Sequence, residues 1–319
     1  MNPTTMPGAW VRSDGTLEIR DLPRPQAGPD TLLVRTLASA LCGSDLHRFR
    51  GAESYGLDTD VFGHESVVEV VDPAGSAFVL GQRLLHVPFP EDGRVFAPFQ
   101  AARPGNLVPL PDDLSDEIAV MAQQLGTVLH ALKAFWPRLE PPVSAFIAGA
   151  GPAGLLFVQV LRLIGCPRVV VAEPSEHRRR LAASLGAEVD SDWTGIDLCV
   201  DAVGEPDARR ECLRRVRVGG TMGVFGLPDR EPGDLGFSAL DLLRQQLTVV
   251  GATGAQWAPG LAPFHEAVRL LAERQVDVAP LISDRVGLAE LPAACLRAAY
   301  PRDQVVKVLA VFPGPEGDG

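Results

Sequence analysis

A glycine-rich turn in the middle of the chain, Gly149-Ala150-Gly151-Pro152-Ala153-Gly154, constrains the fold more than any other feature. It joins an apolar run at 144–148 to another at 153–165, which we interpret as a buried strand followed by a helix. The first glycine permits a tight turn, the second lets the backbone approach a pyrophosphate, and the third lets helix and strand lie close together. Free N–H groups at the start of the helix favour phosphate binding. The residues expected to contact a dinucleotide here are Gly149, Gly151, Pro152, Ala153 and Gly154; a tight corner without a ligand is the alternative.

Strand and helix patterns alternate after this turn, which is typical of βαβ units and a parallel sheet. The predicted strands are 144–148, 168–172, 197–201, 219–226 and 247–252, and the predicted helices are 153–165, 176–185 and 263–274. A further helix is expected from about 115 to 133, where acids precede an apolar-periodic segment. The predicted fold class is therefore α/β, with a doubly wound Rossmann-type parallel sheet.

The first part of the chain has a different sequence pattern. A length of 319 residues also favours two domains. Short β-branched runs such as 31–35 and 67–71 are separated by Pro, Gly and Asp turns, as in a mostly antiparallel β domain. A late apolar strand at 305–312 would complete that sheet. We expect residues 1–124 and 257–319 to form the β-rich domain and 125–256 to form the dinucleotide-binding domain.

An acid stands at the end of the second predicted strand of the dinucleotide domain. Glu173, nineteen residues after Gly154, can accept hydrogen bonds from both ribose hydroxyls and would repel a 2′-phosphate. This favours NAD(H) over NADP(H). Arg178, the first residue of a three-arginine run, is a further candidate for cofactor binding and weakens that preference; Arg179 and Arg180 are interpreted as a solvated helix face.

Charge and cysteine content narrow the classes of partner. The net charge is −11, and no Lys/Arg block is longer than three residues, so neither nucleic acid nor an anionic membrane surface is an expected partner. The five cysteines are scattered without a CxxC pair, which favours a reduced, cytoplasmic protein without disulfides. No basic leader precedes an apolar stretch at the N-terminus, and the apolar run at 143–161 is interrupted by glycine and proline.

Metal-ligating residue types gather in the β-rich part. Cys42-Gly43-Ser44-Asp45-Leu46-His47 is followed after a loop by Gly63-His64-Glu65. Thiolate, imidazole and carboxylate are the ligands that zinc selects, and a catalytic zinc keeps about three protein ligands and one open position. Each residue alone has a structural explanation as a core or hydrogen-bonded group. Their occurrence together, ahead of a dinucleotide fold, favours a metal site.

These motifs, in this order, resemble those of the zinc-dependent medium-chain dehydrogenases/reductases, the alcohol, polyol and sugar dehydrogenase superfamily. The resemblance extends over nearly the whole chain and includes Asp197 to Gly204, the glycine pair at 219–220 and Lys307. It implies a GroES-like catalytic domain next to a Rossmann domain, an alcohol or ketone as substrate, and a homodimer or homotetramer.

The resemblance also implies roles for single residues. Cys42 and His64 would bind one catalytic zinc, with Glu65 as a third ligand able to alternate with water, and Asp45 would orient the His64 ring. In the same scheme Ser44 would accept the substrate's hydroxyl proton and pass a proton through the cofactor ribose to His47, while Thr127 would lie near the nicotinamide. A helix hydroxyl bonded to its own backbone is the alternative for Thr127.

Three departures from the family pattern stand out. No cysteine lies between Cys42 and Cys166, so the lobe that carries a structural zinc in many relatives is absent, and at most one zinc is expected. Gln123 occupies the position of a further Cys or Glu ligand, where a neutral amide would be a weaker donor; a hydrogen bond to nearby backbone is the alternative. Val68 replaces a usual glycine, and Gly81-Gln82 replaces a usual Gly-Asp pair.

The sequence thus predicts a zinc-dependent oxidoreductase that transfers a hydride between NAD(H) and a secondary alcohol or ketone, in particular a sugar, polyol or cyclitol-like compound. Two alternatives remain open. One is a zinc-free, NADPH-dependent enoyl or quinone reductase of the same superfamily, against which the Cys42, His64 and Glu65 set argues. The other is a non-catalytic sensor that only binds the dinucleotide.

Overall fold

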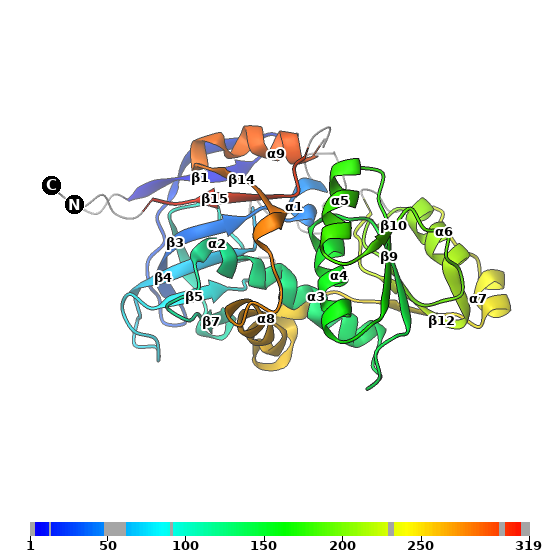
Figure 1. The fold of residues 1–319 in the computed structure, drawn as a ribbon. Helices are drawn as coiled ribbons and strands as arrows, with labels where there is room; N and C mark the ends of the chain where they lie inside the picture. The colour runs from blue at the N-terminus through cyan, green and yellow to red at the C-terminus, as the bar shows by residue number, and fades with distance from the viewer. Residues whose placement is uncertain are drawn as a thin grey trace. The chain divides into compact units, whose positions relative to one another are not determined.

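The computed structural model describes residues 4–12, 14–47, 62–89, 92–228, 233–299 and 304–313. The chain divides into two compact units (Figure 1). The first unit comprises Met1–Gln124, Gln256–Glu273 and Ile282–Gly319, and the second comprises Leu125–Ala255 and Arg274–Leu281.

A six-stranded, all-parallel sheet forms the second unit, in the order β10-β9-β8-β11-β12-β13. The strands are β8 (Ser144–Ala148), β9 (Arg168–Ala172), β10 (Glu188–Val189), β11 (Ile196–Asp201), β12 (Val216–Val224) and β13 (Thr248–Gly251). The helices of this unit are α4 (Pro152–Leu163), α5 (Glu176–Ser184), α6 (Pro206–Arg215) and α7 (Ala239–Gln245), with η5 (Ala279–Leu281). Right-handed crossovers place α4 and α5 on one face of the sheet and α6 and α7 on the other (Figure 1). The predicted doubly wound sheet is confirmed.

The strand order reverses between β8 and β11, and ligands of such sheets bind at the carboxyl ends of the strands next to this point. All five residues of β8 are buried, as a central strand covered on both faces requires. Behind it, the Phe157 ring of α4 stacks on Phe135 at 6.2 Å and meets Phe225 edge-on at 5.2 Å. The glycine turn therefore follows a strand that is buried on both faces, and the helix after the turn is packed through an aromatic cluster.

The first unit is built on a seven-stranded, mostly antiparallel sheet in the order β14-β15-β3-β4-β5-β7, with β6 also paired to β3. Its strands are β3 (Leu32–Ala40), β4 (Ser66–Asp72), β5 (Arg83–His86), β6 (Phe99–Ala102), β7 (Leu107–Pro109), β14 (Ile282–Val286) and β15 (Lys307–Val311), beside the separate hairpin β1 (Thr5–Val11) and β2 (Leu17–Pro23). Its helices are α1 (Gly43–His47), α2 (Asp116–Ala119), α8 (Ala262–Ala272) and α9 (Leu291–Ala299), with the 3₁₀ turns η2 (Pro104–Asn106), η4 (Pro259–Leu261) and η6 (Leu288–Glu290). Two elements cross the division between units: α3 (Met121–Phe135) and η3 (Ala255–Trp257).

Most predicted elements are confirmed, with one difference in detail. The late strand pairs with β3 through the register Ala310↔Ser39, so the chain end does complete the first sheet. The helix expected from 115 to 133 is instead two helices, α2 and α3, separated at Val120. The apolar run at 143–161 forms β8, the glycine turn and most of α4; of the described helices, none has the length and apolarity needed to cross a membrane.

Candidate functional site

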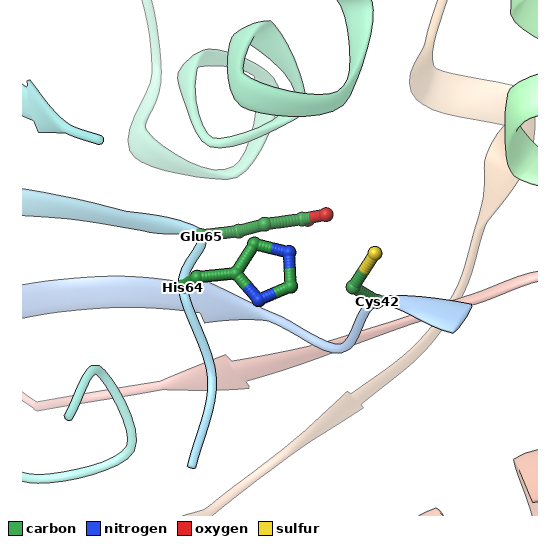
Figure 2. Close-up of side chains that lie close together, drawn as sticks. All are labelled: Cys42, His64 and Glu65. Carbon is green, nitrogen blue, oxygen red and sulfur yellow. The ribbon is translucent and has the colours of Figure 1, made fainter. Parts of the chain in front are cut away.

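Cys42, His64 and Glu65 converge because of how two strands pair. Cys42 follows β3, and His64 and Glu65 directly precede β4, which runs antiparallel to β3. The Ala40 amide donates to the Glu65 carbonyl at 3.0 Å, so the end of one strand lies against the start of the other. One ligand atom from each of the three side chains lies within 4.8 Å of the others, and Figure 2 shows the three pointing toward a common space.

Asp45 connects two members of this cluster. Its Oδ2 accepts a hydrogen bond from the Cys42 amide at 2.9 Å, and its Oδ1 lies 3.5 Å from Nδ1 of His64. A proton on Nδ1 facing this carboxylate leaves Nε2 with the lone pair that a metal requires. Burial lowers the pKa of His64, but the negative charges of Asp45 and Cys42 outweigh it and hold that pKa well above its ordinary value. The surroundings of His64 therefore favour a cation.

Glu65 lies in an unusual environment for a carboxylate. Its side chain is fully buried, and its Oε2 forms an ion pair at 2.7 Å with Nζ of Lys307, which is also fully buried. Lys307 also donates a hydrogen bond to Oε1 of Gln124 at 3.1 Å. Apart from the ion pair with Lys307, neither Glu65 oxygen has a hydrogen-bond partner among the described residues, so lone pairs remain free on the buried carboxylate. Thiolate, imidazole and a carboxylate with free lone pairs fit a zinc ion.

The structure gives less detail for the other residues that we predicted near the metal and the nicotinamide. Gln123 is buried near the start of α3, and Ser44 is exposed on α1. The side chain of His47 lies outside the described part of the structure. Thr127 lies on α3 within the second unit and is partly buried.

The glycine turn has the geometry of a dinucleotide loop. Gly149 has a φ of +95°, in the left-handed region where a side chain is strained, and its N–H bonds to Ala172. A Cβ on Gly154 would lie 2.0 Å from the Gly149 carbonyl oxygen, so only glycine lets α4 approach β8 this closely. A Cβ on Gly151 would meet nothing within 4 Å, which leaves the turn open where a pyrophosphate would approach.

The Glu173 carboxylate is fixed beside this turn. It accepts hydrogen bonds from the Ala150 amide at 2.8 Å and the Ser175 amide at 2.9 Å. Arg179 is bound elsewhere, since it donates to the carbonyl oxygens of Glu173 and Pro174. An acid therefore lies at the carboxyl end of β9, where a ribose is expected.

Arg178 and Arg180 differ in what they contact. Arg180 pairs with Glu176 on the exposed face of α5. Arg178 is partly buried, and its backbone N–H bonds to Ser175, the residue that caps α5. A role of Arg178 in cofactor binding stays a prediction.

Two buried ion pairs that sequence reasoning did not identify support these sites. The first is Glu65 with Lys307; the second is Asp201, at the end of β11, with Arg209 of α6, which are 3.3 Å apart. Arg209 also donates to the carbonyl oxygens of Gly204 at 3.0 Å and Leu235 at 2.6 Å. A charged residue within an apolar segment, as with Lys307 in 305–309, was the signal available in the sequence.

Comparisons with known proteins find similar sequences and a similar fold. A family model described as zinc-binding dehydrogenase matches residues 152–273. An L-threonine 3-dehydrogenase from Thermococcus kodakarensis is 29% identical over 314 residues, covering 83% of this chain and 85% of that protein. A sorbitol dehydrogenase from Bacillus subtilis is 24% identical over 356 residues, covering 98% of each. The solved structure of 2R,3R-butanediol dehydrogenase from Bacillus subtilis has a TM-score of 0.85 at 21% identity, covering 97% of this chain and 100% of that one. The similarity therefore includes both units.

Proposed function

Because the chain belongs to the zinc-binding medium-chain dehydrogenases/reductases, we propose that it transfers a hydride between NAD(H) and a secondary alcohol or ketone at one zinc ion. The observation that carries the proposal is the convergence of Cys42, His64 and Glu65, with Asp45 behind His64. The relatives support the broader activity, NAD(P)-dependent oxidoreduction of an alcohol. The use of zinc, the preference for NAD(H) and the type of substrate are the details that we propose.

Cys42, His64 and Glu65 are the proposed zinc ligands, and Gln123 is a candidate for a further one. Bound zinc would act as a Lewis acid toward the substrate oxygen. Asp45 fixes the tautomer and direction of the His64 ring, and Lys307 balances the Glu65 charge when the carboxylate faces away from the ion. Among the described residues this is the single cluster of at least three such ligands, which supports one zinc.

Ser44 is the proposed proton acceptor. In the oxidative direction bound NAD⁺ would accept the hydride that leaves the carbinol carbon. Ser44 would accept the hydroxyl proton and release its own proton, by way of the cofactor ribose, to His47 and water. The products are a ketone, the reduced cofactor and one proton. The reverse direction uses the same groups.

Glu173 supports NAD(H) as the cofactor. Its carboxylate can accept bonds from both ribose hydroxyls but would repel a 2′-phosphate, and Arg179 is already bound to backbone carbonyls. Arg178 and Thr127 complete the proposed cofactor contacts. For the substrate, the proteins named sorbitol, threonine and butanediol dehydrogenase have in common a substrate with a secondary hydroxyl. A polyol, sugar or cyclitol-like secondary alcohol is therefore the proposed substrate class.

The proposal is tested by measuring zinc and activity in the same sample. The purified protein is expected to hold about one zinc per chain, to oxidise a member of a secondary-alcohol panel with NAD⁺, and to lose that activity on chelation. Cys42→Ser should remove both zinc and turnover. Less than about half an equivalent of zinc with full activity after chelation would instead support the zinc-free reductase, and dinucleotide binding without any turnover would support a sensor.

A further inference from the structure

The short segment Gly93–Ala97 runs alongside the C-terminal half of β3 and is fixed there by buried hydrogen bonds. The carbonyl oxygen of Val95 accepts from the Ser39 hydroxyl at 2.6 Å, and that of Ala97 accepts from the Thr36 hydroxyl at 2.5 Å. Between them the Phe96 carbonyl accepts from the Ala9 amide at 2.9 Å. Val95 and Ala97 are completely buried, and Phe96 is 2% exposed. Three consecutive carbonyls are thus held, two by β3 and one by β1, which leaves this segment little freedom to move.

This segment lies directly against the turn from which His64 projects. A Cβ on Gly93 would lie 2.5 Å from the Gly63 carbonyl oxygen and 3.6 Å from Cβ of His64. Gly63 has a φ of +83°, and a Cβ there would lie 2.5 Å from the Phe96 ring and 2.6 Å from Val95. Both glycines are therefore required by close packing, and Gly93 packs against the carbonyl group of the peptide bond that joins Gly63 to His64.

We propose that the Gly93–Ala97 segment fixes the Gly63–His64 peptide and thereby the direction of the His64 imidazole, which makes Gly93 a positioning residue for the metal. This inference rests on the proposed zinc site. A ligand shell tolerates displacements of only about 0.5 Å, so a backbone that is held from behind binds metal more tightly than a free loop. Gly93 supplies no ligand atom, yet a methyl group there would push the peptide that carries His64 and leads into Glu65. Groups behind a ligand typically change metal affinity by about 10–100-fold.

The test is Gly93→Ala, with Gly105→Ala as the matched control. Neither glycine has a positive φ, so alanine suits both backbones, but a Cβ on Gly105 meets nothing within 4 Å. Zinc affinity would be measured by competition with a chromophoric chelator, and cobalt(II) substitution would report thiolate ligation and ligand geometry by absorption. We expect Gly93→Ala to weaken zinc binding by about 10–100-fold and to alter the cobalt spectrum. Gly105→Ala should match the wild type in both.

Dinucleotide binding and thermal unfolding of the metal-free variants show whether the change is confined to the metal site. Wild-type zinc affinity and cobalt spectrum in a folded Gly93→Ala protein would overturn the inference and leave the proposed function intact. A wild-type protein that binds no stoichiometric zinc would overturn the proposed function, and the inference with it.

A second variant serves if Gly93→Ala does not fold. Phe96→Leu withdraws the ring that contacts Gly63 while keeping an apolar side chain, and Phe312→Leu makes the same change elsewhere in the same core cluster. Weaker zinc binding in Phe96→Leu than in Phe312→Leu, at comparable stability, is the expected result. Equal zinc affinities in the two variants would overturn the inference.

Discussion

The ammonium group of Lys307 lies 2.7 Å from the carboxylate of Glu65, and water reaches neither side chain. Without a metal, this pair is the main compensation for a negative charge that has no hydrogen-bond partner among the described residues. Breaking one member of such a pair leaves an uncompensated buried charge, which typically costs about 3–5 kcal/mol. A metal bound to Glu65 would provide a second source of positive charge.

Lys307→Met is therefore expected to destabilise the metal-free protein by about 3–5 kcal/mol and the zinc-loaded protein by clearly less. The measurement is thermal unfolding of both forms, with Lys133→Met, at an exposed position of α3, as the control. Equal destabilisation with and without zinc would show that Glu65 does not face the ion.

Gln123→Glu tests whether the buried amide on α3 is a further ligand. A carboxylate is a stronger, charged donor, so zinc loss to a chelator should slow on the order of tenfold if the side chain faces the ion. Gln26→Glu, in the loop after β2, makes the same chemical change away from the cluster. Unchanged zinc loss in Gln123→Glu would mean that Gln123 only hydrogen-bonds within the protein.

Local sequence patterns predicted the second unit well because its signals are local. The apolar strand, the glycine turn and the apolar helix that follow one another at 144–163 need no distant partner to be recognised, and the structure has β8, the turn and α4 there. The close approach of Gly154 to Gly149 is the same physical reason that placed glycine in the motif.

Contacts between distant segments could not be predicted in the same way. Lys307 and Glu65 are separated by most of the chain, and only the pairing of β15 and β4 with β3 brings the two strands into one sheet. The contact of Gly93 with Gly63 could not be predicted from the sequence either, because neither residue carries a side chain whose chemistry would indicate it. Sequence patterns gave the types of group at the site, and the sheet determines which groups support them.

Arg209→Met is expected to weaken dinucleotide binding although Arg209 is not a proposed cofactor contact. Arg209 holds Asp201, Gly204 and Leu235 together at the carboxyl ends of the strands, where the cofactor binds in such sheets. We expect the dissociation constant for NADH to rise about tenfold, which corresponds to about 1.4 kcal/mol of binding free energy, measured by fluorescence titration. Arg214→Met on the same helix removes only a half-exposed pair and is the control. An unchanged dissociation constant in a destabilised Arg209→Met protein would assign the pair to stability alone.

Glu173→Ala should shift the cofactor preference toward NADP(H). It removes the carboxylate that would repel a 2′-phosphate and leaves Arg178 nearby. The ratio of kcat/KM for NAD⁺ to that for NADP⁺ is expected to fall by about tenfold or more, through the KM for NAD⁺. Glu176→Ala, which removes an exposed partner of Arg180 on the same helix, should leave that ratio unchanged. An unchanged ratio in Glu173→Ala would place the ribose elsewhere.

His86 gives the protein an acid-sensitive element in the core of the first unit. Burial lowers the pKa of His86 from 6.5 to about 4, while its Nδ1 lies 2.9 Å from Oε1 of Gln100. Below pH 6.5 the imidazole of His86 binds a proton in the unfolded chain, whereas in the folded chain it binds one only near pH 4. The free energy of unfolding therefore decreases as the pH falls from 6.5 to about 4, because the unfolded chain gains a proton at His86 first. The decrease due to His86 is about 3 kcal/mol at most. His86→Gln should unfold with a shallower pH dependence between pH 6.5 and 4 than the wild type, measured by denaturant titration at each pH. His265→Gln, at an exposed position, should retain the wild-type dependence, and a variant curve parallel to the wild type would refute a neutral buried His86.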